Sequence, residues 1–381
     1  MNKILYFIII VSFLDTFVQL PIITPYSLSL GATHFLAGSI VAVYSLTNMV
    51  GNIYGGHWID KYGRKRMLLI GMVAAAFILF LYPVAQNGMQ LFFIRFLHGL
   101  AGGILIPAAF AYVGDQSKKG SRGKAMAITG ACIGTAAIVG PAFGGIMASR
   151  LQFEIVFIII AILFAISCVL IYKYIEESYA STDRGKFSYK EFIPLLKHPL
   201  IIQGSLAAFA IMISNGTLAF ALPLKVEAIG LDSSTTGLLL STYGIVALII
   251  FLTPLNKMYD RLSPIALVVT GIIFIGFVHV MFNFTTAYPL LFAFMVIYGV
   301  GFAFVFPSMN KIIADASSKV DRGKAYGIFY AFFSLGAVFG SFVSGATSDA
   351  FGLPFLSSAL TMFTVCIVQI IIAQKTKTKP V

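Results

Sequence analysis

Long apolar stretches alternate with short polar ones along the whole chain. Each apolar stretch holds about 20 residues or more, the length that an α-helix needs to cross the roughly 30 Å hydrocarbon core of a bilayer. The pattern predicts an all-α polytopic membrane protein with twelve transmembrane helices. The expected spans lie near residues 4–27, 33–56, 67–86, 89–112, 124–148, 154–174, 199–223, 233–254, 264–284, 288–312, 323–346 and 354–374.

The composition agrees with this pattern. Hydrophobic residues make up 59% of the 381 residues and charged residues only 10%, whereas a soluble domain contains about 25% charged residues. The mean hydropathy is +0.94. The net charge of +12 would suggest nucleic-acid binding in a soluble protein, but no basic domain exists outside the loops. We therefore expect the lipid bilayer, and no nucleic acid, as a partner.

The positions of Lys and Arg orient the predicted spans, because cytoplasmic loops of membrane proteins are enriched in these residues. With both termini in the cytoplasm, only Arg150 and Lys225 fall on external loops and Arg95 falls in a span. The other 23 of the 26 Lys and Arg residues lie on the cytoplasmic side. A wrong number of helices would scramble this distribution. We expect a multi-pass protein of a cell membrane, in particular a bacterial plasma membrane, with cytoplasmic termini.

The chain consists of two similar halves. A polar linker at 175–198 separates an N-terminal six-helix bundle at 1–174 from a C-terminal one at 199–381. At a shift of 200 residues, the tetrapeptide Arg-Gly-Lys-Ala at 122–125 recurs at 322–325. Shared apolar composition does not easily produce an identical charged tetrapeptide in register. Halves repeated in the same orientation imply a pseudo-two-fold axis along the membrane normal.

The connection between the second and third spans carries a basic motif. It reads Gly56-His-Trp-Ile-Asp60-Lys-Tyr-Gly63-Arg64-Lys-Arg66, and we expect it to form a loop. This spacing resembles the signature between helices 2 and 3 of the major facilitator superfamily of transporters, and the repeat extends the resemblance to nearly the whole chain. The resemblance implies a central cavity between the halves and alternating access by rocking of one half against the other.

In that superfamily the acidic residue of the motif is expected to engage the N-terminal end of helix 11 and nearby arginines, which latches the cytoplasmic side shut. A carboxylate at a helix N-terminus is stabilised by roughly 0.3–1 kcal/mol, and glycine permits close backbone approach. The alternative is a basic loop that only determines topology. The expected latch residues are Gly56, Asp60, Gly63, Arg64, Arg122 and Arg322.

An acidic and a basic residue fall inside predicted spans. Asp15 lies about 11 residues in from the cytoplasmic end of the first span, which is roughly 17 Å. Arg95 lies about 6 residues in from the outer end of the fourth, roughly 9 Å. In a core of roughly 30 Å the two depths differ by about 4 Å, so the side chains can interact. We interpret Asp15 and Arg95 as a proton-coupling pair. A structural ion pair, often neutral for stability, is the alternative.

Both spans also carry resemblances. The stretch Arg95-Phe-Leu-His98-Gly99 is similar to a pattern of the superfamily, which favours Gln at the position of His98. The first span, with Phe13-Leu-Asp15 ahead of two prolines, resembles the first helix of the drug:proton antiporters, the multidrug and tetracycline efflux family. We expect H⁺ as the coupling ion and no cofactor. We expect His98 to be a packed or cavity-lining polar group rather than a proton relay.

The fifth predicted span is rich in glycine and alanine and contains Gly140-Pro141-x-x-Gly144-Gly145. It is similar to the Gly-Pro-x-x-Gly-Gly signature of exporters, although upstream glycines of that signature are alanines here. Small residues let helices approach closely, and proline permits a kink. Close packing explains the glycines and alanines but not their order around the proline, so we expect efflux rather than uptake.

The remaining polar and aromatic residues of the spans predict a largely apolar cavity. A sugar transporter would show more Gln, Asn, Glu and Trp in its spans, whereas this chain has 36 Phe and a single Trp, which lies in the basic motif. The balance favours a small lipophilic or amphiphilic substrate. The expected cavity residues are Gln19, Tyr44, Asn48, His98, Asn215, Tyr243, Tyr330 and Phe333.

Alternatives stay open at this point. Within the same fold, an uptake symporter or a lipid or metabolite exporter is the alternative to drug efflux. A membrane enzyme would need convergent His, Cys or acidic ligands, but the five histidines are scattered and the three cysteines lie in separate apolar runs. A sensor would carry an added soluble domain, whereas the tail is a short basic stub. We therefore expect a monomeric transporter that is not an enzyme.

Overall fold

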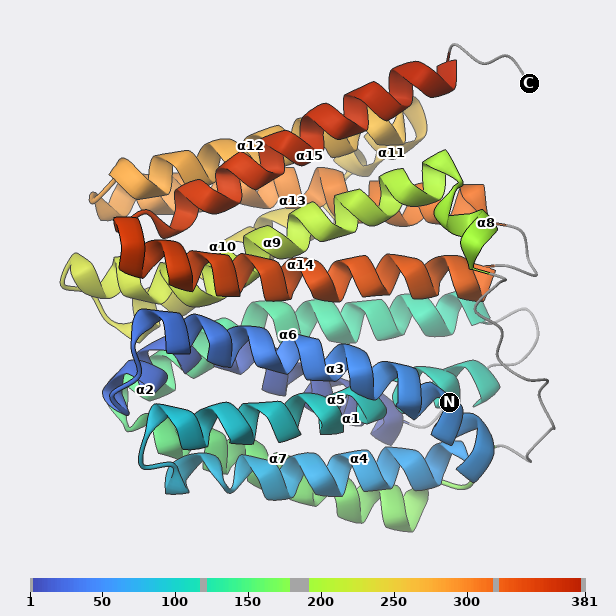
Figure 1. Cartoon of the computed structure of the whole chain (residues 1–381). Coiled ribbons are helices and arrows are strands. Elements are labelled where there is room, and N and C mark those ends of the chain that lie inside the picture. Colours follow the sequence, from blue (N-terminus) through green and yellow to red (C-terminus); the bar gives the residue numbers. More distant parts are fainter. Residues whose placement is uncertain (1–2, 117–121, 179–191, 318–321, 378–381) are drawn as a thin grey trace. The chain divides into compact units, whose positions relative to one another are not determined.

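The computed structural model describes residues 3–116, 122–178, 192–317 and 322–377. A few residues within these ranges are described by their backbone only. In this part of the chain the structure contains helices and no strands (Figure 1).

The first half contains α1 (Lys3–Gln19), α2 (Ile23–Ser29), α3 (His34–Tyr62), α4 (Arg64–Leu79), the 3₁₀ turn η1 (Tyr82–Val84), α5 (Gly88–Gln116), α6 (Arg122–Arg150) and α7 (Phe153–Tyr174). The rest contains α8 (Ile193–Leu196), α9 (Pro199–Ala228), α10 (Ser233–Leu252), η3 (Pro254–Lys257), α11 (Met258–Arg261), α12 (Pro264–Phe284), α13 (Tyr288–Ala316), α14 (Arg322–Phe351) and α15 (Pro354–Lys377).

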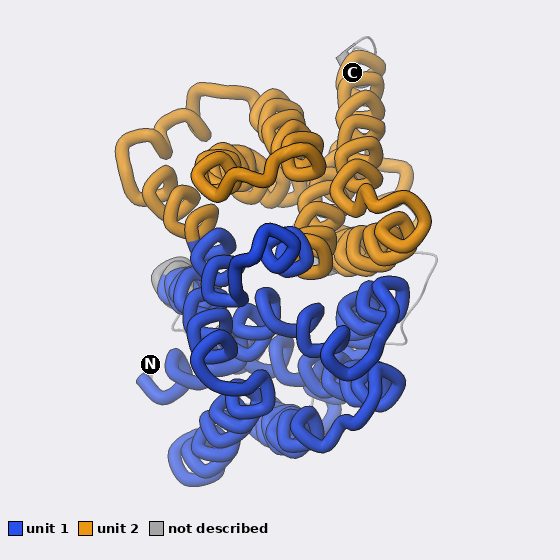
Figure 2. The backbone as a smooth tube through the Cα atoms, turned by 90° about the vertical axis from the view of Figure 1, so that its left-hand side faces the viewer, with its two compact units in different colours: residues 1–184, 222–241 blue, residues 185–221, 242–381 orange. Residues whose placement is uncertain are grey.

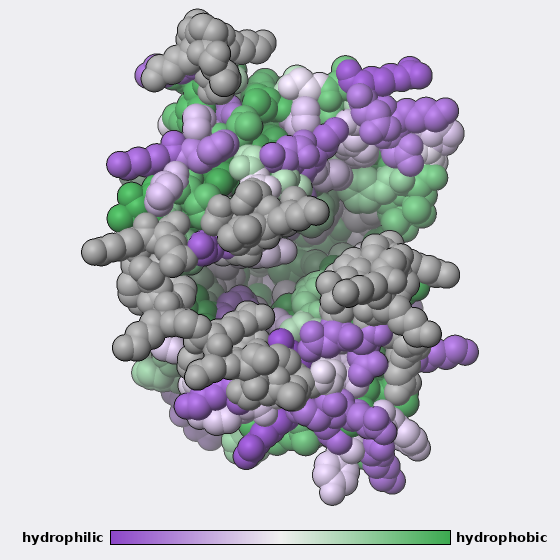
Figure 3. Space-filling model, turned by 90° about the vertical axis from the view of Figure 1, so that its right-hand side faces the viewer, coloured by the Kyte–Doolittle hydropathy of each residue, from purple (hydrophilic) through white to green (hydrophobic). Residues whose placement is uncertain are grey.

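These helices confirm the predicted membrane architecture. Eleven of the described helices are long and apolar enough to cross a membrane, and counting the bent pair α1 and α2 as one span gives twelve. Large apolar side chains such as those of Phe77, Leu252 and Ile367 are exposed along them, as expected for surfaces that face lipid. Figure 3 looks along the helices at their right-hand ends in Figure 1, and on this face hydrophilic side chains are widespread, with hydrophobic ones visible between them.

The first predicted span, 4–27, is not one straight helix. It consists of α1 and α2, which meet at an angle of 52°. Pro21 lies in the turn between them, and proline cannot donate the backbone hydrogen bond that would continue the helix. The amide of Ile22 bonds instead to the carbonyl oxygen of Gln19 at 3.1 Å. The break therefore ends α1 at a polar residue rather than in the middle of an apolar run.

The prediction of a loop over the basic motif at 56–66 is wrong. Helix α3 continues to Tyr62 and α4 begins at Arg64, so that only Gly63 separates them. Gly63 has a φ of +100°, which residues with a side chain rarely adopt. The prediction ended the helix where the sequence becomes polar, which was too early. A helix needs apolar residues only within the hydrocarbon core and can continue into water.

The chain divides into two compact units (Figure 2). Unit 1 contains Met1–Arg184 and Leu222–Ser241, and unit 2 contains Gly185–Ala221 and Thr242–Val381. In unit 1, α3 packs along α5, α1 along α6, and α4 against both α5 and α7. In unit 2, α12 packs against α13 and α15.

Glycines permit the close contact between α3 and α5. A Cβ atom at Gly51 would lie 2.6 Å from the carbonyl oxygen of Leu100, and one at Gly103 would lie 2.4 Å from the carbonyl oxygen of Asn48. Any larger residue would push the two helices apart. This close approach brings the polar side chains of α3 next to those of α5 in the interior of unit 1.

Candidate functional site

Six polar side chains gather in the interior of unit 1. We call them the unit 1 cluster: Asp15 and Gln19 on α1, Tyr44 on α3, Tyr82 on η1, and Arg95 and His98 on α5. All six are buried, with Asp15 only 3% and Arg95 only 6% exposed. Residues three or four apart share one face of a helix, so each of the two helical pairs points the same way.

Gln19 links the two charged residues of the cluster. Its Nε2 donates to Oδ1 of Asp15 at 2.6 Å, and its Oε1 accepts from Nη1 of Arg95 at 2.5 Å. The predicted contact between Asp15 and Arg95 is therefore indirect. The side chains of α1 and α5 thus come near one another, but an amide occupies the space between the two charges.

His98 lies between Asp15 and Tyr82. Its Nε2 is 3.1 Å from Oδ2 of Asp15, an ion-pair distance whose angle falls outside that of a hydrogen bond. Its Nδ1 is 2.9 Å from the hydroxyl oxygen of Tyr82. The ring of Tyr44 meets the imidazole edge-on, with centroids 5.4 Å apart. His98 is thus a packed residue, as expected, but it also stands where a proton can pass to or from Asp15.

Tyr82 is a member of the cluster that the sequence did not reveal. Its hydroxyl also accepts from Nη1 of Arg95 at 3.4 Å. The only available signal was a tyrosine next to Pro83 at the end of an apolar run, where a 3₁₀ turn forms. That turn, rather than a continued helix, carries the ring back toward α5.

Unit 2 holds an uncharged counterpart of this cluster. The hydroxyl of Tyr243 donates to Oδ1 of Asn215 at 3.5 Å, which brings together two predicted cavity residues. The hydroxyl oxygen of Ser214 is 2.8 Å from both Nε2 of His279 and the hydroxyl of Tyr298. No carboxylate joins this group in the described part of the chain. Sequence reasoning missed His279 and Tyr298, although Tyr298 occupies the repeat position of the buried histidine in unit 1.

Of the other three predicted cavity residues, Asn48 lies one turn after Tyr44 on α3, and Tyr330 and Phe333 lie on α14. Asn48 accepts a hydrogen bond from Asn52 at 3.0 Å along α3. Tyr330, 55% exposed, and Phe333 belong to a row of aromatic rings on α14, with centroids 6.1 Å apart. Among the described residues, none of the three forms a hydrogen bond to either cluster. Nor does the described part of the chain bring together three His, Cys, Asp or Glu residues that could hold a metal ion.

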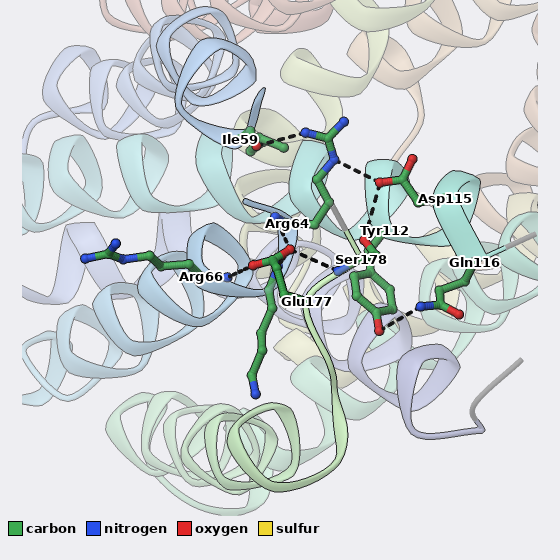
Figure 4. A network of polar contacts seen from close by, with 9 residues as sticks. Ile59, Arg64, Arg66, Tyr112, Asp115, Gln116, Glu177 and Ser178 are labelled. Carbon is green, nitrogen blue, oxygen red and sulfur yellow. Dashed lines mark hydrogen bonds and ion pairs between the residues drawn. The ribbon is translucent and has the colours of Figure 1, made fainter. Parts of the chain in front are cut away.

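A second polar network of unit 1 lies at the junction of α3 and α4 (Figure 4). Arg64, only 5% exposed, donates from Nε to Oδ2 of Asp115 at 3.0 Å and from Nη1 to the carbonyl oxygen of Ile59 at 2.8 Å. Asp115 also accepts from the hydroxyl of Ser178 at 3.3 Å. The arginine of the basic motif is therefore paired with the end of α5, a partner that the motif alone did not indicate.

The carboxylate of Glu177 caps the N-terminus of α4 (Figure 4). It accepts from the backbone amides of Arg64 at 2.8 Å, Lys65 at 3.2 Å and Arg66 at 3.3 Å. These are three of the four amides that a helix leaves without partners at its start. Glu177 belongs to the stretch predicted as a linker, so the beginning of that stretch is bound to unit 1.

The predicted latch is described only in part. Three of its side chains lie outside the described residues, those of Asp60, Arg122 and Arg322. At Gly63 the expected close approach is present, because a Cβ atom there would lie 2.5 Å from Oε2 of Glu177. At Gly56 no described atom lies within 4 Å of the place where a Cβ would stand, so the close approach there stays a prediction.

The corresponding turn of unit 2 is held by hydrogen bonds to backbone carbonyl oxygens. Between α10 and α12, the hydroxyl of Tyr259 donates to the carbonyl oxygen of Ala303 at 2.7 Å. Burial raises the pKa of Tyr259 to about 12, so its hydroxyl stays protonated and keeps donating at neutral pH. Lys311 donates to the carbonyl oxygen of Tyr259 at 3.1 Å. The two units therefore anchor their equivalent turns by different chemistry.

The glycine-proline motif of α6 packs on two sides within unit 1. A Cβ atom at Gly144 would lie 2.2 Å from the carbonyl oxygen of Val18 on α1. One at Gly140 would lie 2.6 Å from the Cβ atom of Phe17 on the same helix α1. On the other side, a Cβ at Gly145 would lie 2.2 Å from the carbonyl oxygen of Ser233, at the start of α10. The motif thus lets α6 touch the helix that carries the buried acid.

Comparison with known proteins places this geometry in a family. A model of the Major Facilitator Superfamily matches the chain twice, at residues 5–206 and 204–380, which confirms the internal repeat. The quinolone resistance protein NorA of Staphylococcus aureus is 24% identical over 365 residues, which cover 92% of this chain and 91% of that protein. The multidrug resistance protein MdtG of Salmonella typhimurium is 25% identical over 352 residues, which cover 91% and 86%.

Solved structures share the fold. A POT family transporter in complex with 5-aminolevulinic acid has a TM-score of 0.80 at 14% identity, over 99% of this chain and 96% of that one. The human organic anion transporter MFSD10 has a TM-score of 0.70 at 14% identity, over 96% and 98%. At this identity the likeness shows a common architecture and leaves the substrate open.

Proposed function

The chain belongs to the Major Facilitator Superfamily and is a membrane transporter of small molecules, not an enzyme; from this premise we propose that it is a proton-coupled efflux antiporter. Its substrates would be small lipophilic or amphiphilic compounds moved by alternating access. The resistance proteins that it resembles along most of its length support efflux, as does the glycine-proline motif of α6.

The observation that carries the proposal is the burial of Asp15. Of the carboxylates whose side chains the structure describes, Asp15 alone is buried. A charged group inside a span is costly, so its retention suggests a function. Asp15 has a partner in each protonation state. The amide of Gln19 donates to the carboxylate, and Nε2 of His98, 3.1 Å away, can face either the charged or the protonated carboxyl group. We assign it the role of the group that takes up and releases the coupling proton.

Exchange follows if proton and substrate compete for the same state of the cluster. An ionised Asp15 favours a cationic or polar substrate group nearby, whereas a protonated Asp15 removes that attraction. A cycle in which each ligand drives off the other moves them in opposite directions. The coupling ion would be H⁺, without a cofactor, and Arg95 would tune the cluster through Gln19.

The proposal extends to topology and gating. The distribution of Lys and Arg favours cytoplasmic termini in a bacterial plasma membrane, and we propose that the protein acts as a monomer. The junction of α3 and α4, with Arg64 and Glu177, would then lie on the cytoplasmic side. There Asp60, Arg122 and Arg322 would complete a latch that closes that side.

Transport in proteoliposomes tests the proposal. A pH gradient would drive ethidium, a fluorescent lipophilic cation, while an enclosed dye reports protons, for the wild type, Asp15→Asn and the control Glu227→Gln, an exposed acid at the end of α9. We expect the wild type and the control to exchange ethidium for protons, and Asp15→Asn to fall to the rate of protein-free liposomes. Continued coupling in Asp15→Asn would show that the proton site lies elsewhere.

The second candidate is uptake symport, or export of a lipid or metabolite, with the same fold. It is kept because transporters of different kinds, among them the peptide-bound POT family, share this architecture. The same liposomes separate the candidates. Accumulation of substrate together with protons would favour symport, and no response of any drug-like cation would turn the search to lipids and metabolites.

A further inference from the structure

Arg95 is a buried cation that no carboxylate contacts directly. Its guanidinium donates to three oxygens: Oε1 of Gln19 at 2.5 Å, the hydroxyl of Tyr82 at 3.4 Å and the carbonyl of Ile40 at 3.4 Å. All three acceptors are neutral. Within the described part of the chain, Arg95 forms no ion pair, since Asp15 is engaged by Gln19 and His98.

This arrangement is unusual for a buried charge. Removing a guanidinium from water costs several kcal/mol, and buried charges are normally paired with an opposite charge. The only buried acid of the cluster is held one amide away, with its two oxygens turned to other groups. The positive charge of Arg95 is therefore solvated by dipoles alone, two of them at the long distance of 3.4 Å.

The guanidinium is also shaped and placed for a ligand. Its Cζ atom lies 4.3 Å from the centroid of the Tyr44 ring, within the range of a cation–π contact. Two of its nitrogens carry the described hydrogen bonds, and Nη2 has no partner among the described residues. The planar fork of a guanidinium matches the two oxygens of a carboxylate, and here Nη2 is the one nitrogen without a described partner.

Gln19 occupies part of that place. Its amide oxygen stands against Nη1, where one carboxylate oxygen would bind, and its flexible side chain can turn aside. We propose that Arg95 binds a carboxylate of the transported compound, which displaces the amide oxygen of Gln19 and gains a charge-assisted pair of hydrogen bonds. The substrate class is therefore an amphiphile with an apolar body that carries an acidic group for Arg95 and, for the proposed competition with the proton, a cationic or polar group for Asp15.

This inference rests on the proposed function in one respect: the unit 1 cluster must be reached by substrate. It does not depend on the direction of transport or on the coupling ion.

A pair of probes that differ in one charge tests the inference. Dansylglycine carries a free carboxylate, and its methyl ester has the same ring system without the charge. Binding of each to purified protein would be followed at pH 7 by dansyl fluorescence, for the wild type, Arg95→Gln, Arg95→Lys and Arg150→Gln. Arg150 is an exposed arginine at the end of α6, so its variant removes the same charge away from the cluster.

We expect the wild type and Arg150→Gln to bind the acid at least about tenfold more tightly than the ester, which corresponds to about 1.4 kcal/mol. Arg95→Gln should bind both probes alike. Arg95→Lys keeps the charge and the fold but loses the fork and the stacking, so most of the preference should disappear. This variant gives the answer if Arg95→Gln does not fold, as judged by thermal unfolding.

Equal binding of acid and ester to the wild type, no binding of the acid, or an undiminished preference in Arg95→Lys would overturn the inference. Its failure is distinguishable from that of the proposed function. Gradient-driven exchange of ethidium could persist without any acid preference, and an acid preference that depends on Arg95 could persist without proton coupling.

Discussion

Replacing Glu177 should loosen the start of α4 and with it the end of unit 1 where α3 meets α4. The carboxylate bonds to three successive amides, at 2.8, 3.2 and 3.3 Å, that have no partner within the helix. Loss of a side-chain cap typically costs about 0.5–2 kcal/mol. An anion at a helix N-terminus contributes about 0.3–1 kcal/mol of interaction with the helix dipole. Because Glu177 is exposed, we expect Glu177→Ala to lower the free energy of unfolding by about 1 kcal/mol.

Two substitutions separate the charge from the hydrogen bonds. Glu177→Gln keeps one acceptor oxygen and loses the charge, so it should cost less than Glu177→Ala. The charge-dependent part should shrink in salt of about 1 M, where the Debye length is about 3 Å. The matched control is Glu176→Ala, because Glu176 is an exposed neighbour outside the cap.

Thermal unfolding in detergent measures these effects. The single tryptophan, Trp58, lies on α3 near the junction with α4, and its fluorescence reports this end of unit 1. For a unit of about 200 residues, 1 kcal/mol shifts the Tm by about 2–4 °C. An unchanged Tm in Glu177→Ala, or an equal loss in Glu176→Ala, would refute the idea that the cap stabilises the junction.

Three further predictions concern the packing, the cluster and the latch. Gly144→Ala should destabilise the protein and slow transport, because its methyl group would overlap the backbone of α1, whereas Gly130→Ala, with open space around it, should be neutral or stabilising in the same thermal unfolding assay. Tyr82→Phe removes the hydroxyl that contacts His98, so the pH profile of gradient-driven transport should move; an unchanged profile would make Tyr82 a packing residue. Asp60→Asn should impair transport but leave equilibrium binding of ethidium intact, and a clear loss of binding would contradict a latch.

The spans of this protein follow from one length scale. The bilayer core demands about 20 apolar residues for each helix, and the predicted span at 264–284 coincides with α12 as the structure has it. Where the prediction erred, the helix left the bilayer or broke within it. Helix α3 continues to Tyr62, since water tolerates a polar helix end, and Pro21 bends the first span because its missing amide interrupts the hydrogen bonds.

The charged residues of the candidate site could be predicted from the sequence, because charged residues are rare inside membrane spans. Asp15 and Arg95 stood out because charged residues inside apolar runs are costly, and helical rise placed them at similar depth. The sequence could not show that Gln19 stands between them, since rotamers and interhelical distances decide which of several polar side chains fills the gap.

Contacts between segments far apart in the chain could not be predicted from the sequence, for a further reason. Glu177 lies 111 to 113 positions from the amides that it caps, and Arg64 lies 51 positions from Asp115. Nothing in the local pattern around either carboxylate distinguishes it from other charges at a membrane surface. Only the packing of α4 against α5 and α7 brings them together.

The amino-acid sequence by itself determined the number of spans, the repeat of two halves and the family, because bilayer thickness and helix geometry leave a chain of this hydrophobicity few alternatives. It also singled out the buried acid and the buried arginine. The tertiary structure decided which groups those charges meet: an amide between them, a histidine on the acid and an aromatic ring on the arginine. These contacts depend on side-chain positions at the ångström scale, set by how closely α1, α3 and α5 approach one another.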